Sequence, residues 1–157
     1  MTFSINLASL NGSNGFRLDG IGYQDRSGLT VSNAGDVNGD GLDDVIISSS
    51  GVDAYGSCYV VFGQLAGFDR VFNLSSLDGK YGFRLDDESS QEGLGRTVSN
   101  AGDVNGDGFD DLIVGSAKNF HNNGYSNYSY VIFGKASGFD AVKSIPKLKL
   151  DGTNGFR

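Results

Sequence analysis

One eleven-residue segment occurs twice in this chain without a single change. The sequence VSNAGDVNGDG fills residues 31–41 and returns at 98–108, so that Asp36 and Asp103 lie 67 residues apart. Each copy runs on into an acidic pair and an apolar stretch, LDDVIIS in the first and FDDLIVG in the second. A repeat at a fixed interval is typical of folds that stack one supersecondary unit on the next.

Each repeated unit contains the material for four short strands. We expect them at 29–35, 44–48, 58–62 and 71–86, and in the second unit at 96–102, 111–115 and 130–133. Their spacing favours an antiparallel meander, and the absence of a sustained 3.6-residue apolar period predicts little helix. The second and third strands are continuously apolar, which is typical of strands covered on both faces. The predicted fold class is therefore all-β, with two four-stranded antiparallel blades of a β-propeller.

Longer matches between the two halves set the expected domain limits. Residues 5–20 match residues 72–87, and LDGTNGFR at 150–157 opens a third copy. We expect residues 1–28 to form the fourth-strand segment of a preceding or neighbouring blade, 29–87 the first blade, and 88–157 the second blade with a partial third repeat. The four residues by which the second unit is longer fall between 115 and 127, and their polar, Gly/Asn-rich sequence predicts a surface loop.

Two blades are too few to close a propeller, which typically needs four or more. Two open apolar blade faces predict association, because large exposed apolar patches are rare on monomers. We therefore expect the chain to be a homo-oligomer in which three or four copies complete one ring. The alternative is that the chain is a piece of a longer array of blades.

Charge and composition exclude several classes of function. The formal net charge is −7, and eight of the 19 acidic residues lie in the two repeated loops. Without a basic stripe, nucleic acid is excluded as a partner. No apolar run is long enough for membrane insertion, and no basic-then-apolar leader opens the chain. Cys58 is the single cysteine; we expect a buried structural thiol, with a reactive or intermolecular thiol as the alternative.

Oxygen-bearing side chains dominate both repeated loops. They fall at positions 1, 3, 5, 8 and 9, counted from Asp36 or from Asp103. Calcium takes six to eight oxygen ligands, and the loop glycines permit the tight curl that such a site needs. The predicted ligands of two Ca²⁺ ions are Asp36, Asn38, Asp40, the Leu42 carbonyl and Asp44 in the first loop, and Asp103, Asn105, Asp107, the Phe109 carbonyl and Asp111 in the second.

The position-8 residues Asp43 and Asp110 are expected to face solvent or to reach the ion through water. Tight hairpin turns alone would explain the glycines. They would not explain four acidic side chains within nine residues, which repel each other without a cation. Magnesium prefers stiffer octahedral sites and zinc prefers His or Cys, so calcium is the predicted ion.

Three further motifs accompany each loop. GFRL occurs at 15–18 and 82–85, AGDVNGDG is followed by an acidic pair at 34–46 and 101–113, and the units close with VVFG at 60–63 and VIFG at 131–134. These motifs resemble the FG-GAP repeats of the integrin α-subunit propeller and of bacterial and cyanobacterial surface proteins. The resemblance implies a propeller, usually seven-bladed, with calcium in the hairpin between the first and second strands. It also implies an extracellular or cell-surface protein, although adhesion does not follow from the repeats alone.

The leading functional hypothesis is a non-enzymatic calcium-binding scaffold of integrin-like type that mediates protein or surface interactions. The alternative is a calcium-dependent carbohydrate-binding, lectin-like propeller, with Tyr23, Phe120, Tyr125 and Tyr128 as stacking platforms for sugars. Catalysis is not expected, because His121 is the only histidine and no G-x-S-x-G nucleophile elbow is present. The possible ligands are thus a protein or a glycan, in addition to further copies of the chain.

Overall fold

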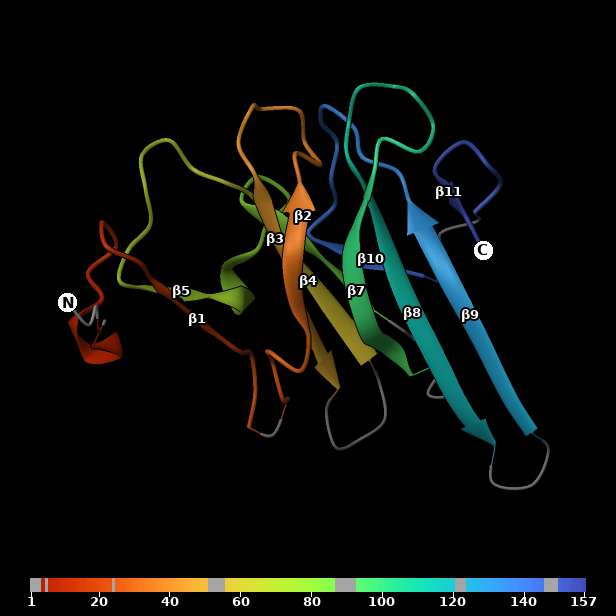
Figure 1. The fold of residues 1–157 in the computed structure, drawn as a ribbon, viewed down its shortest axis with the longest axis horizontal. Helices are drawn as coiled ribbons and strands as arrows, with labels where there is room; N and C mark the ends of the chain where they lie inside the picture. Colours follow the sequence, from red (N-terminus) through yellow and green to blue (C-terminus); the bar gives the residue numbers. More distant parts are fainter. Residues whose placement is uncertain are drawn as a thin grey trace.

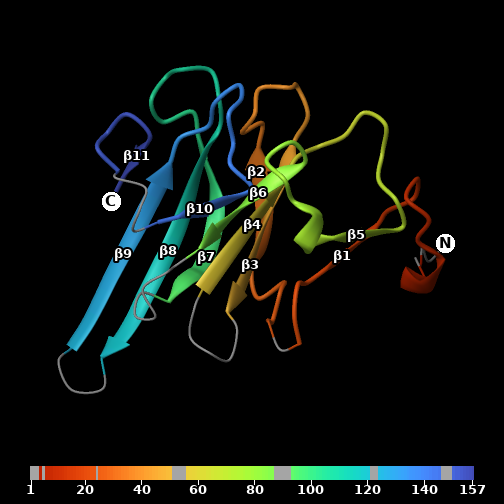
Figure 2. The same cartoon turned by 180° about the vertical axis from the view of Figure 1, so that it is seen from behind.

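Two β-sheets lie face against face in the computed structural model of the chain (Figures 1 and 2). The structure describes residues 4, 6–23, 25–50, 56–86, 93–120, 124–145 and 150–157, and for residues 50, 117–120 and 124–127 the backbone only. The described residues include only two helical segments, the short 3₁₀ turns η1 (Leu7–Ser9) and η2 (Leu74–Ser76). The prediction of an all-β fold with little helix is therefore confirmed.

The first sheet is an antiparallel meander with one additional strand. Its order is β10-β6-β4-β3-β2. Four of these strands run antiparallel in chain order: β2 (Val31–Gly35), β3 (Asp44–Ser50), β4 (Gly56–Val61) and β6 (Gly82–Asp86). The fifth, β10 (Val142–Ser144), comes from the second half of the chain and pairs parallel with β6. This strand ties the second half of the chain to the first sheet.

The second sheet is antiparallel throughout, in the order β11-β9-β8-β7. Its strands are β7 (Leu94–Gly102), β8 (Asp111–Phe120), β9 (Gly124–Ile132) and β11 (Gly155–Phe156). The polar segment that holds the extra residues of the second unit was predicted to be a surface loop, but its described parts, 117–120 and 124–127, belong to the β8–β9 hairpin. Its ladder continues through Ala117↔Asn127 to Phe120↔Gly124, because the backbone of both segments stays extended and in register.

The segment 71–86, which was predicted to be one strand, is in fact three elements. β5 (Val71–Asn73) pairs parallel with β1 (Arg17–Asp19), η2 follows, and only β6 joins the first sheet. The strand ends because Asn73 caps the turn, accepting a hydrogen bond from the Ser75 N–H at 2.9 Å. The β1–β5 pair lies to the side of the two main sheets (Figure 1). It has the same parallel arrangement as the β6–β10 pair.

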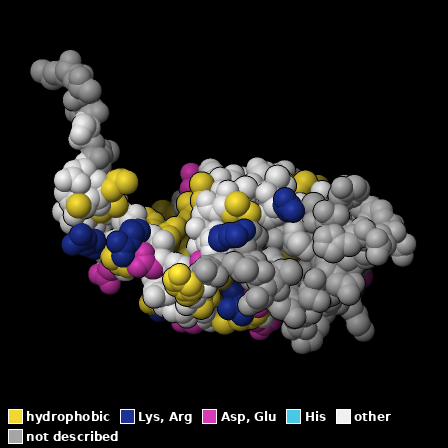
Figure 3. Space-filling model, turned by 90° about the horizontal axis from the view of Figure 1, so that it is seen from below, with side chains coloured by type: hydrophobic (Ala, Val, Ile, Leu, Met, Phe, Trp, Pro, Cys, Tyr) yellow, Lys and Arg dark blue, Asp and Glu magenta, His cyan; other side chains and the backbone are white. Residues whose placement is uncertain are grey.

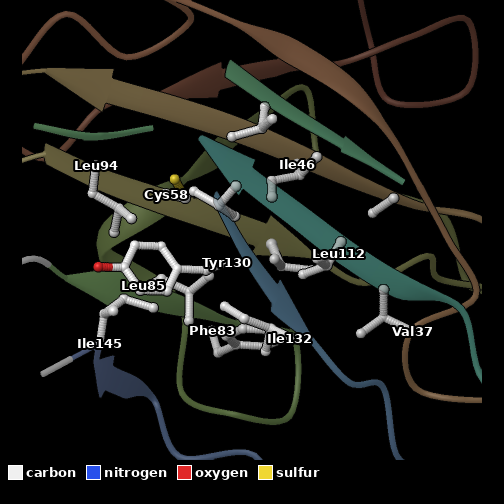
Figure 4. Packing of buried hydrophobic residues seen from close by; sticks show 14 of the residues in the cluster. Val37, Ile46, Cys58, Phe83, Leu85, Leu94, Leu112, Tyr130, Ile132 and Ile145 are labelled. Carbon is white, nitrogen blue, oxygen red and sulfur yellow. The ribbon is translucent and has the colours of Figure 1, made fainter. Parts of the chain in front are cut away.

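The main hydrophobic core lies between the two sheets (Figure 4). The first sheet contributes residues such as Ile46, Cys58 and Phe83, and the second contributes Leu112 and Ile132, all at most 3 % exposed. The apolar residues of β3 and β4 are buried on both faces, as predicted, since a second cluster forms on the other side of the first sheet. That cluster consists of Ile47, Tyr59, Val61, Leu74 and Leu77, with Leu18, Val45, Phe68 and Phe72 packed against it.

The described surface carries no continuous region of basic charge on the face seen in Figure 3. Lys and Arg side chains lie among Asp and Glu side chains there, most visibly at the N-terminal end. None of the described helices is long and apolar enough to cross a membrane. The expected limits of the blades along the chain stay a prediction.

Candidate metal centre

Each acidic loop begins at an irregularity that ends the first strand of its sheet. The pairing register shifts between Asn33 and Gly35 and between Asn100 and Gly102. The Asn33 side chain accepts the Gly35 N–H at 2.8 Å, and Asn100 accepts the Gly102 N–H at 2.5 Å. Both glycines have positive φ values, 73° and 70°, which an L side chain rarely adopts. The bulges direct both loops outward at the same end of the two sheets (Figure 1).

The first loop curls around its own acidic side chains. Asp36 accepts the N–H groups of Asp40 and Gly41, at 3.0 and 2.9 Å. The Asn38 amide accepts the Asp40 N–H at 2.9 Å and donates to the Asp40 carboxylate at 3.0 Å. Asp40 in turn accepts the Leu42 N–H at 2.9 Å. The structure thus brings the predicted ligands at positions 1, 3 and 5 together.

The second loop repeats these contacts almost bond for bond. Asp103 accepts the N–H groups of Asp107 and Gly108, at 3.0 and 2.9 Å. Asn105 bridges to Asp107 with hydrogen bonds of 2.9 and 2.8 Å, and Asp107 accepts the Phe109 N–H at 3.0 Å. Nearly the same sequence gives nearly the same loop geometry, because these contacts are made within each loop.

The position-9 carboxylates are buried at the base of the loops. Asp44 is 1 % exposed, and its two oxygens accept the N–H groups of Val37 at 3.0 Å and Gly63 at 2.8 Å. These bonds fasten the start of the loop and the end of the third strand to the same side chain. Since an unpaired buried carboxylate would be costly, the two N–H donors are what permit Asp44 to lie here.

Asp111 occupies the corresponding place in the second sheet. It is fully buried and accepts the N–H groups of Val104 at 2.9 Å and Gly134 at 3.0 Å. The partners Gly63 and Gly134 were not identified as functional from the sequence. The signal that would have found them is the FG dipeptide that closes VVFG and VIFG in both units.

The electrostatics of the first loop favour a bound cation. Burial raises the pKa of Asp44 to about 7, although the hydrogen bonds from Gly63 and Val37 lower it, and the negative charges of Asp40 and Asp36 raise it further. A cation beside the loop would offset both the burial and the repulsion. The donors are carboxylate, amide and carbonyl oxygens, which suit a hard cation such as Ca²⁺.

The residues present therefore fit a calcium ion by their chemistry. Among the described residues, however, no three Asp, Glu, His or Cys side chains converge into one ligand group. Asp36 and Asp40 turn their oxygens towards the loop amides instead. Asn38 and backbone carbonyls would have to complete the coordination, so the ten predicted ligands stay a prediction.

The two position-8 residues behave differently from each other. The Asp110 carboxylate accepts the N–H of Asp36, in the other loop, at 2.8 Å. It therefore connects the two repeats, a role that the sequence analysis missed because no pattern within one repeat reveals a partner 74 residues away. Its counterpart Asp43 is exposed, and no described residue donates to its side chain.

Of the residues considered for other functions, two have described side chains, Tyr23 and Tyr128. Tyr23 is 95 % exposed, whereas Tyr128 packs against the core with the Arg157 guanidinium 4.2 Å from its ring centre. His121 and the side chains of Phe120 and Tyr125 lie outside the described residues. The carbohydrate-binding alternative stays a prediction. Cys58 is fully buried, as expected for a structural thiol.

Comparison with known proteins agrees with this geometry. The family model of the FG-GAP repeat matches residues 94–132, which comprise β7, β8, the second acidic loop and β9. This part of the chain is thus similar to an FG-GAP repeat. The first sheet has the same acidic-loop sequence and the same order of its first three strands. The FG-GAP repeat is an element of β-propellers, in agreement with the all-β fold.

The chain is also similar to a curated protein, integrin alpha-4 of Xenopus laevis. The two are 31 % identical over 95 residues, which are 60 % of this chain and 9 % of the integrin. The chain therefore corresponds to a small part of that relative. The similarity extends beyond the single matched FG-GAP repeat, because 95 aligned residues exceed the length of one 67-residue unit.

Proposed function

We propose that the chain is a calcium-binding β-propeller module of integrin-like type, which acts as a non-enzymatic structural and interaction scaffold. Its FG-GAP repeats present two acidic loops at one end of the molecule (Figure 1). Further copies of the chain, three or four in all, complete the propeller. An extracellular or cell-surface location is part of the proposal, supported by the similarity to an integrin.

The observation that carries the proposal is the matching arrangement of the two loops. In each, the side chains at positions 1, 3 and 5 are held together by hydrogen bonds, and a buried carboxylate lies at the base. Two independent copies of such a loop are difficult to explain as turns, because a turn needs no buried carboxylate beneath it.

Calcium has a structural role in this proposal. The ion neutralises the carboxylates of a loop and fixes the hairpin between the first two strands. Because Asp44 and Asp111 also bind Gly63 and Gly134, order in the loop is transmitted to the end of the third strand. A ligand that binds the folded state and not the unfolded state raises stability by mass action.

Titration calorimetry tests the proposal directly. We expect two calcium ions to bind per chain, and we expect the thermal unfolding temperature to rise in calcium and to fall when excess chelator is added. Magnesium at the same concentration serves as the control and should have a weaker effect, because it dehydrates reluctantly and demands octahedral geometry. No heat of calcium binding, with unfolding unchanged by chelator, would refute the calcium part of the proposal.

A further inference from the structure

Three hydrogen bonds join the first acidic loop to the second repeat, two of them to the second acidic loop and one to Lys135, which follows β9. The Asp36 N–H donates to the Asp110 carboxylate at 2.8 Å, and the Asp110 N–H donates to the Asp36 carbonyl at 3.1 Å. The Lys135 N–H donates to the Val37 carbonyl at 3.0 Å. We call this set of contacts, between Asp36 and Val37 on one side and Asp110 and Lys135 on the other, the repeat joint.

Close packing accompanies the repeat joint. Val37 is 1 % exposed because the second repeat covers it. A Cβ atom at Gly39 would overlap the Phe109 ring, and a Cβ at Gly35 would overlap the Asp110 carboxylate. The joint therefore requires glycine at both positions for space as well as for backbone conformation.

Because the sequence repeats, each side of the repeat joint has a second copy, and the two copies lie on the outer sides of the molecule. On the second repeat, Asp103, Val104 and Gly106 correspond to Asp36, Val37 and Gly39. Val104 is 50 % exposed, and no described atom lies within 4 Å of a Cβ built at Gly106 or Gly102. This side of the second repeat therefore has all the groups of one side of the repeat joint, and no described residue covers it.

The first repeat carries the complementary half. Leu42, Asp43 and Gln64 correspond to Phe109, Asp110 and Lys135. Asp43 is exposed, and among the described residues no hydrogen bond is made by its carboxylate or by the Gln64 N–H. The two free surfaces are therefore the two sides of one interface that already exists inside the chain.

We propose that a second copy of this chain docks head to tail through a copy of the repeat joint. Asp43 of one copy accepts the Asp103 N–H of the other, the Gln64 N–H donates to the Val104 carbonyl, and Leu42 packs over Gly106. The second copy is the occupant for which the surface is built, because each contact reproduces one observed within the chain.

The apolar faces support the same pairing. The second hydrophobic cluster, around Ile47, Tyr59 and Val61, lies on one face of the first sheet. The corresponding residues of the second sheet face the main core. In the main core these residues are covered by Ile46 and its neighbours from the other sheet. The residue corresponding to Ile46 in the second repeat is Ile113, which is 36 % exposed. Docking would place Ile113 of one copy over the second cluster of the other.

The strand β1 gives the interface a further element. β1 pairs with β5 as β6 pairs with β10, but β6 is also bonded to β4, whereas β1 has no second strand among the described residues. In the second sheet, β9 corresponds to β4. There β11 takes the place of β6, because Phe156 pairs with Val131 as Phe83 pairs with Val60. In the docked pair, β1 of one copy replaces β11 on the β9 of the other.

Such a head-to-tail contact uses two different surfaces, so it forms rings when the rotation closes and open chains when it does not. The inference deepens the assembly part of the proposed function and rests on it. None of the groups that form the three hydrogen bonds is a predicted direct ligand of calcium, so we expect association in chelator as well.

Sedimentation of the full chain over a range of concentrations tests the docking. We expect the weight-average mass to rise with concentration in the unmodified chain. Asp43→Lys and Val104→Lys should each abolish the rise, because one half of the interface is lost in each. Tyr23→Lys is the control: Tyr23 is 95 % exposed, is not part of the proposed contacts, the second cluster or β1, and should leave association unchanged. An unmodified chain that stays monomeric at all concentrations overturns the proposal.

Mixing the two variants identifies the interface. Asp43→Lys keeps the Asp103 side intact, and Val104→Lys keeps the Asp43 side intact. We therefore expect an equimolar mixture to form a 1:1 dimer of twice the monomer mass and nothing larger. A mixture that stays monomeric while the unmodified chain associates overturns the head-to-tail arrangement.

Removal of residues 150–157 should strengthen association, because it frees β9 for β1. Weaker association contradicts the strand replacement.

Calcium titration of the same variants separates this inference from the proposed function. Val104 is not among the predicted ligands and its side chain is half exposed, so the Val104→Lys variant should still bind two calcium ions. Calcium binding without association retains the metal hypothesis and rejects the docking. Association that persists in chelator, with no calcium binding in calorimetry, retains the docking and rejects the metal hypothesis.

Discussion

The Asp110 carboxylate accepts the backbone N–H of Asp36 at 2.8 Å, across 74 residues of chain. Asp36 is itself the first residue of the other acidic loop, and both of its side-chain oxygens bind amides of that loop. A single side chain of the second repeat therefore contacts the residue about which the first loop is organised. The two loops are therefore in direct contact through this side chain.

We expect Asp110→Ala to lower the free energy of unfolding by about 1.5–3 kcal/mol, as is usual when a hydrogen bond to a charged acceptor is lost. Asp43→Ala is the matched control, because Asp43 has the same position in its repeat but is exposed; in dilute protein it should change stability by less than about 0.5 kcal/mol. Urea denaturation at low protein concentration measures both. Equal effects of the two substitutions would show that the cross-repeat hydrogen bond contributes nothing.

A second matched pair tests the packing of the joint. Gly39 and Gly106 have similar positive φ values, 73° and 77°, so Ala at either position should cost about 1 kcal/mol of backbone strain. Only at Gly39 would the new Cβ overlap the Phe109 ring. We therefore expect Gly39→Ala to lower the free energy of unfolding by about 1 kcal/mol more than Gly106→Ala does, which is at the low end of the usual cost of overpacking. Thermal unfolding of the two variants side by side measures this difference.

The calcium hypothesis predicts independent loss of the two sites. Asp40→Ala should remove binding to the first loop and Asp107→Ala to the second, so that each variant binds one ion instead of two. The double variant should bind none, and its unfolding temperature should no longer respond to chelator. Calorimetry gives the stoichiometry, with the exposed Asp69→Ala as the control outside both loops. Two ions bound to either single variant would place the ligands elsewhere.

Stability at alkaline pH should depend on Cys58. Burial, and to a lesser degree the charge of Asp86, raises the pKa of this thiol far above its usual value. The stabilising effect of the protonated thiol is complete below the unfolded pKa of about 8.5 and is lost as the pH rises beyond it, by about 1.4 kcal/mol per pH unit. Between roughly pH 8.5 and 10, the unmodified chain should therefore lose about 2 kcal/mol more than Cys58→Ala.

Urea denaturation at several pH values measures this difference in slope. The raised pKa of Tyr59, caused first by burial, contributes equally to both proteins and cancels. A native thiol that reacts with a thiol reagent as fast as the urea-unfolded chain would contradict the burial on which the prediction depends.

Much of the fold was predictable because its determinants are local. The strands β2, β3 and β4 follow from turn residues and apolar runs, and they lie within a few residues of their expected limits. The segment 71–86 was predicted wrongly, since β5 and β6 pair with different partners and sequence alone does not say which strands become neighbours. The hairpin β8–β9 is longer than predicted because backbone pairing tolerates a polar, Asn-rich sequence.

By itself, the sequence determined the repeat, the acidic loops and the sheet-forming segments, because each depends on contacts within about a dozen residues. The tertiary structure alone decided how the repeats meet. Asp43 and Asp110 occupy the same position of the same motif, yet one is exposed and the other bonds to Asp36. The physical reason is that a repeated sequence gives each unit the same two surfaces, and only the packing of one unit against another determines which surface is buried and which stays free.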